Sequence, residues 1–327
     1  MVKLMVHLSH VQKEALLSWI RTETKRHNRD NLSRTSAYLK FYRKNPEIKW
    51  SLLASAVSRN AGYNMTSLQS KRFQSLMSMK VRAHLFTFFE RANWLIFADA
   101  YPQLLLYQLS KKMESPLFSL LTDLNISSFS EHEWQLFWFK KDEERLMTSL
   151  IINEQYHLQH TLIETLFAKE KILSQLPFLL EDHAHLSYVL FPTLEEKMYG
   201  VSVTNFKKVE ARIELGKKLA QILYHPDCHE VIKLFLLGTE HTGSRRDYER
   251  LSKKWTTTNQ TPILRLAYQE FKHQRPKITS WCLTPKQIGK FYQPVKEKKP
   301  KERTNWLKWK ESELAFIYFC QFPKKIF

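Results

Sequence analysis

Residues 81–109 read VRAHLFTFFERANWLIFADAYPQLLLYQL and form the most apolar stretch of the chain. Glu90 and Asp99 interrupt this stretch, so it lacks the composition of a membrane-spanning helix. Pro102 also lies within it, and a proline inside a helix removes a backbone hydrogen bond and clashes with the preceding turn. The stretch therefore predicts two packed helices, over about residues 82–100 and about residues 102–113.

The segments on both sides show helical spacing of their apolar residues as well. Gly62 is predicted to end one helix, because glycine readily adopts the left-handed conformation of a C-cap. Ser130 and Glu133 have the spacing of a capping box at the start of a long helix. The predicted helices cover about residues 11–27, 47–59, 66–78, 131–171, 203–225, 227–238, 245–255 and 262–274. A further predicted helix carries Tyr38, Leu39, Phe41 and Tyr42 and stops before Pro46.

The glycine content supports a helical fold. Only six glycines occur in 327 residues, which is too few for the turns of a β-rich protein. We therefore expect an all-α fold, an irregular multi-helix bundle over residues 1–275 with a basic C-terminal extension. Residues 276–327 are expected to be a linker or tail with a short apolar segment, 314–322, near the end.

Charge and cysteine content narrow the class of protein. Lys and Arg outnumber Asp and Glu by 51 to 32, a formal net charge of +19 that attracts nucleic acid, acidic membrane surfaces or acidic proteins. The three cysteines are widely spaced and form no CxxC pair, which fits a reducing compartment. The apolar N-terminal run is interrupted by charged residues and does not resemble a signal peptide. We expect a cytoplasmic protein.

The basic residues are concentrated near the C-terminus, where residues 286–310 hold nine Lys or Arg against two Glu. Tyr292, Trp306 and Trp309 are interleaved with them, and such aromatic rings can stack on unpaired bases. A solvated linker is the alternative interpretation. The candidate anion-binding residues in this tail are Lys298, Lys299, Lys301 and Arg303.

A second candidate anion site is the turn His241-Thr-Gly-Ser-Arg-Arg246. Ser244 can cap a helix that begins with Arg245 and Arg246, and a helix start with arginines can hold a phosphate. An ordinary capped helix start explains the same residues, and no nucleotide-binding motif is present.

Polar residues embedded in apolar helices form a further candidate site. A buried charge needs a partner or a metal, or its pKa shifts. Such residues can brace the bundle as a buried network, or they can form a functional pocket. The candidates are Arg59, Asn60, Glu90, Arg91, Asn93, Asp99, Asn153, Glu154 and His157.

Glu154-Gln-Tyr-His157 places a carboxylate and an imidazole on one helical face. Ferritin-like di-iron bundles use this spacing twice and add one glutamate from each of two other helices. Glu90 could be one of these glutamates. A second copy of the motif is missing, although Asp182 and His185 have the same spacing. A metal site at Glu90, Glu154 and His157 is therefore one hypothesis among several.

Several blocks of sequence resemble a known family. They are Asn45-Pro-Glu-Ile-Lys-Trp50, Val57-Ser-Arg-Asn60, Glu90-Arg-Ala-Asn93, Asp99-Ala-Tyr-Pro-Gln-Leu-Leu-Leu-Tyr107, Ile151-Ile-Asn-Glu-Gln155 and His241-Thr-Gly-Ser-Arg-Arg-Asp-Tyr248. They are similar to the domain of unknown function family numbered 2515, from endospore-forming bacteria. The resemblance implies a cytoplasmic helical protein and no particular activity or cofactor.

The sequence leaves three classes of function open. The first is a non-enzymatic protein that binds a polyanion such as nucleic acid, or an acidic partner, through its basic tail. The second is a helical-bundle enzyme or metal- or cofactor-binding protein with a pocket around Glu90 and Glu154-x-x-His157. The third is a peripheral membrane or assembly factor. No catalytic motif selects among them, and the oligomeric state is left open.

Overall fold

The computed structural model describes residues 9–164, 188–203, 205–250, 261–276, 281–296, 299–305 and 309. These residues are mainly α-helical, as predicted, with one small antiparallel hairpin. The α-helices are α1 (His10–His27), α2 (Asn31–Lys44), α3 (Lys49–Ser67), α4 (Lys71–Leu76), α5 (Met79–Met113), α6 (Ser128–Lys140), α7 (Glu143–Leu158), α8 (Val209–Leu223), α9 (His229–Gly238), α10 (Arg246–Glu249), α11 (Leu264–Ala267) and α12 (Pro285–Phe291). The other elements are a 3-10 helix η1 (Phe118–Leu124), a π-helical turn η2 (Gln159–Ile163) and the strands β1 (Tyr188–Pro192) and β2 (Met198–Ser202).

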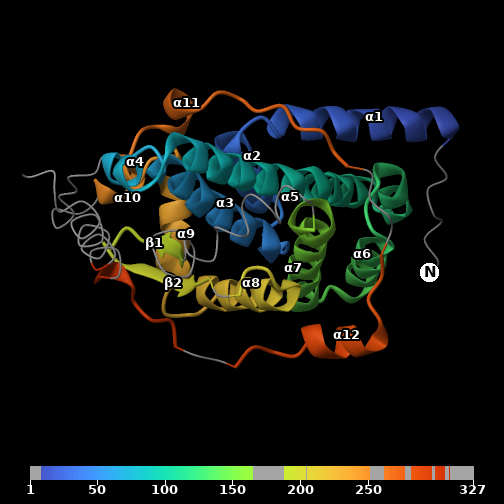
Figure 1. The fold of residues 1–327 in the computed structure, drawn as a ribbon. Helices are drawn as coiled ribbons and strands as arrows, with labels where there is room; N and C mark the ends of the chain where they lie inside the picture. Colours follow the sequence, from blue (N-terminus) through green and yellow to red (C-terminus); the bar gives the residue numbers. More distant parts are fainter. Residues whose placement is uncertain are drawn as a thin grey trace, which may run out of the picture.

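Helix α3 forms the centre of the bundle, and α2, α5, α7 and α8 pack around it (Figure 1). Almost every residue from Trp50 to Ser67 is buried, because helices cover α3 on all sides. The hairpin lies beside α3 and α8, with Tyr188 of β1 paired with Ser202 of β2. The core is therefore built by helix-on-helix packing, and the hairpin closes one end of it.

The prediction of two helices divided at Pro102 is wrong, because α5 is one continuous helix. It runs unbroken from Met79 to Met113 with Pro102 inside it and buried. Helices α1, α3 and α7 pack along α5 and hold its two halves together. Tertiary packing thus overrides the local cost of the proline.

Gly62 does not end a helix either, because α3 continues through it to Ser67. A Cβ atom at this position would collide with the side chain of Asn31 and would lie 2.9 Å from Nε2 of His241. Glycine is needed here for close approach of a polar side chain rather than for a turn.

The long helix predicted over 131–171 is interrupted. Lys141 adopts a left-handed conformation and ends α6, and the Asp142 side chain accepts a hydrogen bond from the backbone N–H of Arg145 to cap α7. The cap of α6 is Ser127 rather than Ser130, since the Ser127 hydroxyl accepts from the Ser130 N–H. The hairpin was not predicted, and α8 and α11 are shorter than expected. Residues 251–255 of the helix predicted over 245–255 lie outside the described residues.

The chain after α11 wraps around the bundle. Figure 1 shows it following α5 to the far end of the molecule, reaching α12 and returning beneath α8. Trp281 stacks on Phe129 and on Tyr156, at 4.9 and 4.8 Å between ring centroids. The described part of the predicted tail thus packs on the helices, whereas its apolar segment 314–322 lies outside the described residues. No helix in the described part of the chain is long and apolar enough to cross a membrane.

Candidate functional site

Glu90 is held in a buried ion pair with Arg34, a partner that the sequence analysis did not select. The Arg34 guanidinium donates to Oε2 of Glu90 at 2.5 Å, and both side chains are almost fully buried. Arg34 also donates to Asn28, whose amide donates to the Trp94 carbonyl. Burial raises the pKa of Glu90, and the Arg34 guanidinium opposes this shift. This arrangement joins α2 to α5.

His273 approaches the other oxygen of Glu90. Its Nε2 lies 3.9 Å from Oε1 of Glu90, and burial lowers the pKa of His273 to about 4. Arg91, the next residue along α5, is half-buried, and burial lowers its pKa. The C-terminal segment therefore contributes His273 to this network.

Asp99 is the centre of a second buried network, which links α5 to α7. Its Oδ2 accepts hydrogen bonds from Asn153 at 2.6 Å and from Gln103 at 2.9 Å. Its Oδ1 lies 3.6 Å from Nδ1 of His157 and 3.4 Å from Arg275. Burial lowers the pKa values of both His157 and Arg275. Three of the nine candidate polar residues, Asp99, Asn153 and His157, therefore lie in one network.

Glu90, Glu154 and His157 are not brought together. Glu90 pairs with Arg34, His157 faces Asp99, and Glu154 faces an internal cavity. Among the residues that the structure describes, no group of three or more His, Cys, Asp or Glu side chains is arranged to hold a metal ion. Asp182 and His185 lie outside those residues. The geometry therefore separates the predicted polar pocket into distinct networks.

The cavity beside Glu154 has a volume of about 190 Å³ and lies among α2, α3, α5, α7, α8 and β1. Asn60 and Asn93 also line it, but both are hydrogen-bonded to backbone: Asn60 accepts from the Leu190 N–H, and Asn93 donates to the Phe89 carbonyl. Burial raises the pKa of Glu154 to about 7, although hydrogen bonds from Gln155 and Trp50 oppose this shift. Glu154 is thus the titratable carboxyl of an otherwise mainly apolar cavity.

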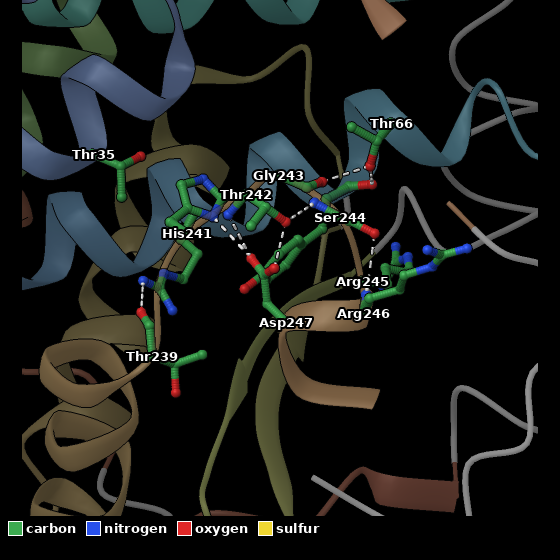
Figure 2. A network of polar contacts seen from close by, with 12 residues as sticks. Thr35, Thr66, Thr239, His241, Thr242, Gly243, Ser244, Arg245, Arg246 and Asp247 are labelled. Atoms are coloured by element: carbon green, nitrogen blue, oxygen red, sulfur yellow. Dashed lines mark hydrogen bonds and ion pairs between the residues drawn. The ribbon is translucent and has the colours of Figure 1, made fainter. Parts of the chain in front are cut away.

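The turn at 241–246 forms a third buried network, shown in Figure 2. Asp247 accepts hydrogen bonds from the backbone N–H and the hydroxyl of Thr242, and it lies 3.4 Å from Nδ1 of His241. Burial favours the neutral acid, but the hydrogen bonds from His241 and Thr242 outweigh it and lower the pKa of Asp247. Nε2 of His241 faces Oδ1 of Asn31 at 3.0 Å. Burial lowers the pKa of His241 to about 4.

The serine and arginines of this turn brace the fold. The Ser244 hydroxyl donates to the Thr261 carbonyl at 2.7 Å. The Arg245 guanidinium donates to Ser67, Asn64 and Tyr248, so its N–H groups are directed into the protein. Arg246 is exposed at the start of α10.

Arg59 is a buried candidate residue on α3. It donates to the Thr239 carbonyl, and its guanidinium lies 5.3 Å from the ring centroid of Phe235. Arg59 therefore connects α3 to α9 rather than to Glu90 or Glu154.

A basic groove runs between α8 and the returning C-terminal segment, with a volume of about 780 Å³. Lys217 donates to the backbone carbonyls of Phe291 and Gln293, which ties the two walls together. Seven cationic side chains line the groove, against the carboxylates of Glu210 and Glu214. They are Lys217, Lys218, Lys290, Lys296, Lys299, Lys301 and Arg303. Three of the four tail residues predicted to bind anions are among them, and Lys298 lies outside the described residues.

Sequence reasoning missed the residues that complete these sites. Arg34, Tyr38 and Lys217 come from segments far from the predicted sites and belong to no motif. Arg34 could have been noticed as a charge one helical turn before the apolar positions Ala37 and Tyr38, but its partner could not.

The fold and these sites define a mainly α-helical protein with buried ionic networks, an internal cavity and a basic groove. The chain belongs to the family described as "Protein of unknown function (DUF2515)", whose model matches residues 26–310. It is similar to "Uncharacterized protein YppC" of Bacillus subtilis (strain 168), with 43% identity over 303 residues, 93% of this chain and 94% of the relative. The family resemblance inferred from the sequence is confirmed. No solved structure matches the chain.

Proposed function

We propose that this protein binds nucleic acid non-specifically through the basic groove and that the helical bundle serves as its scaffold. The observation that carries the proposal is that, among the described residues, α8 and the segments 290–296 and 299–303 bring seven cations and two carboxylates to one groove. A groove lined by one sign of charge concentrates its field and attracts a polyanion. Neutralising phosphates with Lys and Arg releases counterions, which drives such binding without reading sequence.

The groove keeps its excess positive charge after its internal pairs are counted. Lys218 pairs with Glu214 at 2.6 Å, and Lys217 is used to hold the tail segment. Lys299 lies 3.8 Å from Asp227, but its side chain is 85% exposed, so this pair is weak. Arg303 lies over the ring of Tyr188. Most of the cations therefore remain directed to an anionic partner.

Fluorescence anisotropy with a labelled single-stranded DNA of about 20 nucleotides tests the proposal. The triple variant Lys296→Glu, Lys299→Glu, Lys301→Glu should weaken binding strongly. It should also reduce the slope of log affinity against log salt by about 2, because each lost phosphate contact removes about 0.7 from that slope.

The matched control carries Lys25→Glu, Lys44→Glu and Lys112→Glu. These lysines are exposed on α1, α2 and α5, away from the groove lining, and the net charge changes equally. Equal loss in both triple variants would show that overall charge, not the groove, drives binding and would contradict the proposal. Binding of polyglutamate in place of DNA would indicate an acidic protein partner.

A cytoplasmic location is part of this proposal. Cys228 and Cys282, the cysteines in the described part of the chain, are free thiols, which supports a reducing compartment.

A further inference from the structure

The internal cavity beside Glu154 is large for a protein interior. Cores are packed at the density of organic crystals, with few voids larger than a water molecule. A cavity of about 190 Å³ exceeds an engineered apolar cavity of about 150 Å³ that binds benzene. The cavity is partly open to solvent, mainly apolar and lined by one titratable carboxyl, which is the character of a small-molecule site.

One polar group of the cavity wall, the Tyr38 hydroxyl, has no hydrogen-bond partner within the described structure, although the Tyr38 side chain is only 3% exposed. Buried polar groups are nearly always hydrogen-bonded, so an unpartnered one requires an explanation. Glu154 contributes to the raised pKa of Tyr38, which places the carboxyl and the hydroxyl in the same neighbourhood.

The Glu154 carboxyl has no cationic partner among the described residues. Its hydrogen bond at 2.9 Å comes from the neutral amide of Gln155. Arg212 also lines the cavity, but its guanidinium bonds to Gln155, Gln159 and the Phe206 carbonyl. This contrasts with Glu90, which has Arg34, and with Glu133, which has Arg145.

Six aromatic side chains border the same space: Tyr38, Trp50, Phe88, Phe89, Tyr188 and Phe206. Aromatic faces attract cations, and the attraction strengthens when the cation is removed from water. A carboxyl without a cation, an acceptor hydroxyl and aromatic walls together match an ammonium group on a small apolar body.

We propose that the cavity binds a small organic amine, with the ammonium group on Glu154 and the Tyr38 hydroxyl and the apolar body among the aromatic rings. This site shares Tyr188 with the wall of the basic groove, but the proposal does not depend on nucleic-acid binding. The volume limits the ligand to roughly ten non-hydrogen atoms, by comparison with benzene in the smaller engineered cavity.

Calorimetric titration of the full-length protein with benzylamine and cyclohexylamine tests the proposal, with benzyl alcohol and cyclohexanol as neutral isosteres. The amines should bind at least about tenfold more tightly than the alcohols at pH 8. Their affinity should fall about tenfold at pH 6, because the ammonium requires the ionised Glu154 carboxylate. Alcohols that bind as tightly as the amines, or an affinity that rises at pH 6, would overturn the proposal.

Variants locate the binding site. Glu154→Gln should lower amine affinity at least about tenfold, whereas the control Glu144→Gln, at an exposed position of the same helix, should not. Tyr38→Phe should weaken amine binding and leave the groove intact. Ala92→Leu, which fills the cavity, should abolish amine binding and preserve DNA binding. Amine binding that survives both Glu154→Gln and Ala92→Leu, or no amine binding to the parent protein, would refute the site.

Discussion

Gly62→Ala is the substitution for which the structure makes the sharpest prediction, because helix propensity predicts a gain in stability whereas tertiary packing predicts a loss. In a helix, alanine is favoured over glycine by about 1 kcal/mol. Gly62 lies inside α3 with ordinary helical geometry, so helix propensity alone predicts stabilisation. The added Cβ, however, would meet the side chain of Asn31 and lie 2.9 Å from Nε2 of His241.

The size of the stability loss depends on the side chain that the new Cβ atom displaces, which is Asn31. Asn31 is fully buried and donates to the carbonyl of Ser58 at 2.8 Å, and it faces His241 at 3.0 Å. Displacing it leaves buried polar groups without partners, at about 1–3 kcal/mol, and overpacking adds about 1–3 kcal/mol. After the gain in propensity is subtracted, we expect a net loss of about 1–5 kcal/mol in the free energy of unfolding.

Urea unfolding followed by circular dichroism measures this loss. Gly238→Ala, at the end of α9, is the control, because a Cβ there meets no atom within 4 Å. The control should be neutral or stabilising by up to about 1 kcal/mol. A Gly62→Ala protein as stable as the parent would show that Asn31 is not held as described and would refute the reasoning.

Two further predictions concern buried carboxyls. Arg34→Met leaves Glu90, which is 4% exposed, without its ion-pair partner, so unfolding in urea should show a loss of about 3–5 kcal/mol. The double variant Arg34→Met, Glu90→Met should recover part of this loss, and a double variant as unstable as the sum of the single variants would contradict the pairing. The pKa of Glu154 is raised from 4.5 to about 7, so the folded state binds the proton more tightly than the unfolded state. Stability should therefore fall by roughly 2–3 kcal/mol as pH rises from about 4.5 to about 7, and Glu154→Gln should remove this fall; identical pH profiles for parent and variant would count against a buried Glu154.

Sequence reasoning reached the fold class and most of the helices. Periodicity located α1, α2, α8 and α9 because apolar spacing is a property of each segment alone. It was wrong at Pro102 and Gly62, where the packing of neighbouring elements decides whether a helix continues. It also missed the hairpin 188–202.

The candidate pocket residues were chosen as embedded polar groups, and their grouping could not be predicted. Asp99, Asn153 and His157 do meet, because α5 and α7 pack against each other. Glu90 and Glu154 belong to separate sites, and Arg34 is 56 residues from Glu90 in sequence. Conversely, two lysines of α8, Lys217 and Lys218, join the predicted basic tail only in the folded chain.

The sequence by itself determined the helical class, the excess positive charge and the family. These depend on composition and on spacing along one segment, and helix formation is a local event. Only the tertiary structure decided that Arg34 neutralises Glu90, that Glu154 faces a cavity and that the tail and α8 form a groove. The physical reason is that an ion-pair partner, a cavity or a groove forms between segments that are far apart in the chain. The sequence of one segment does not specify which other segment will pack against it.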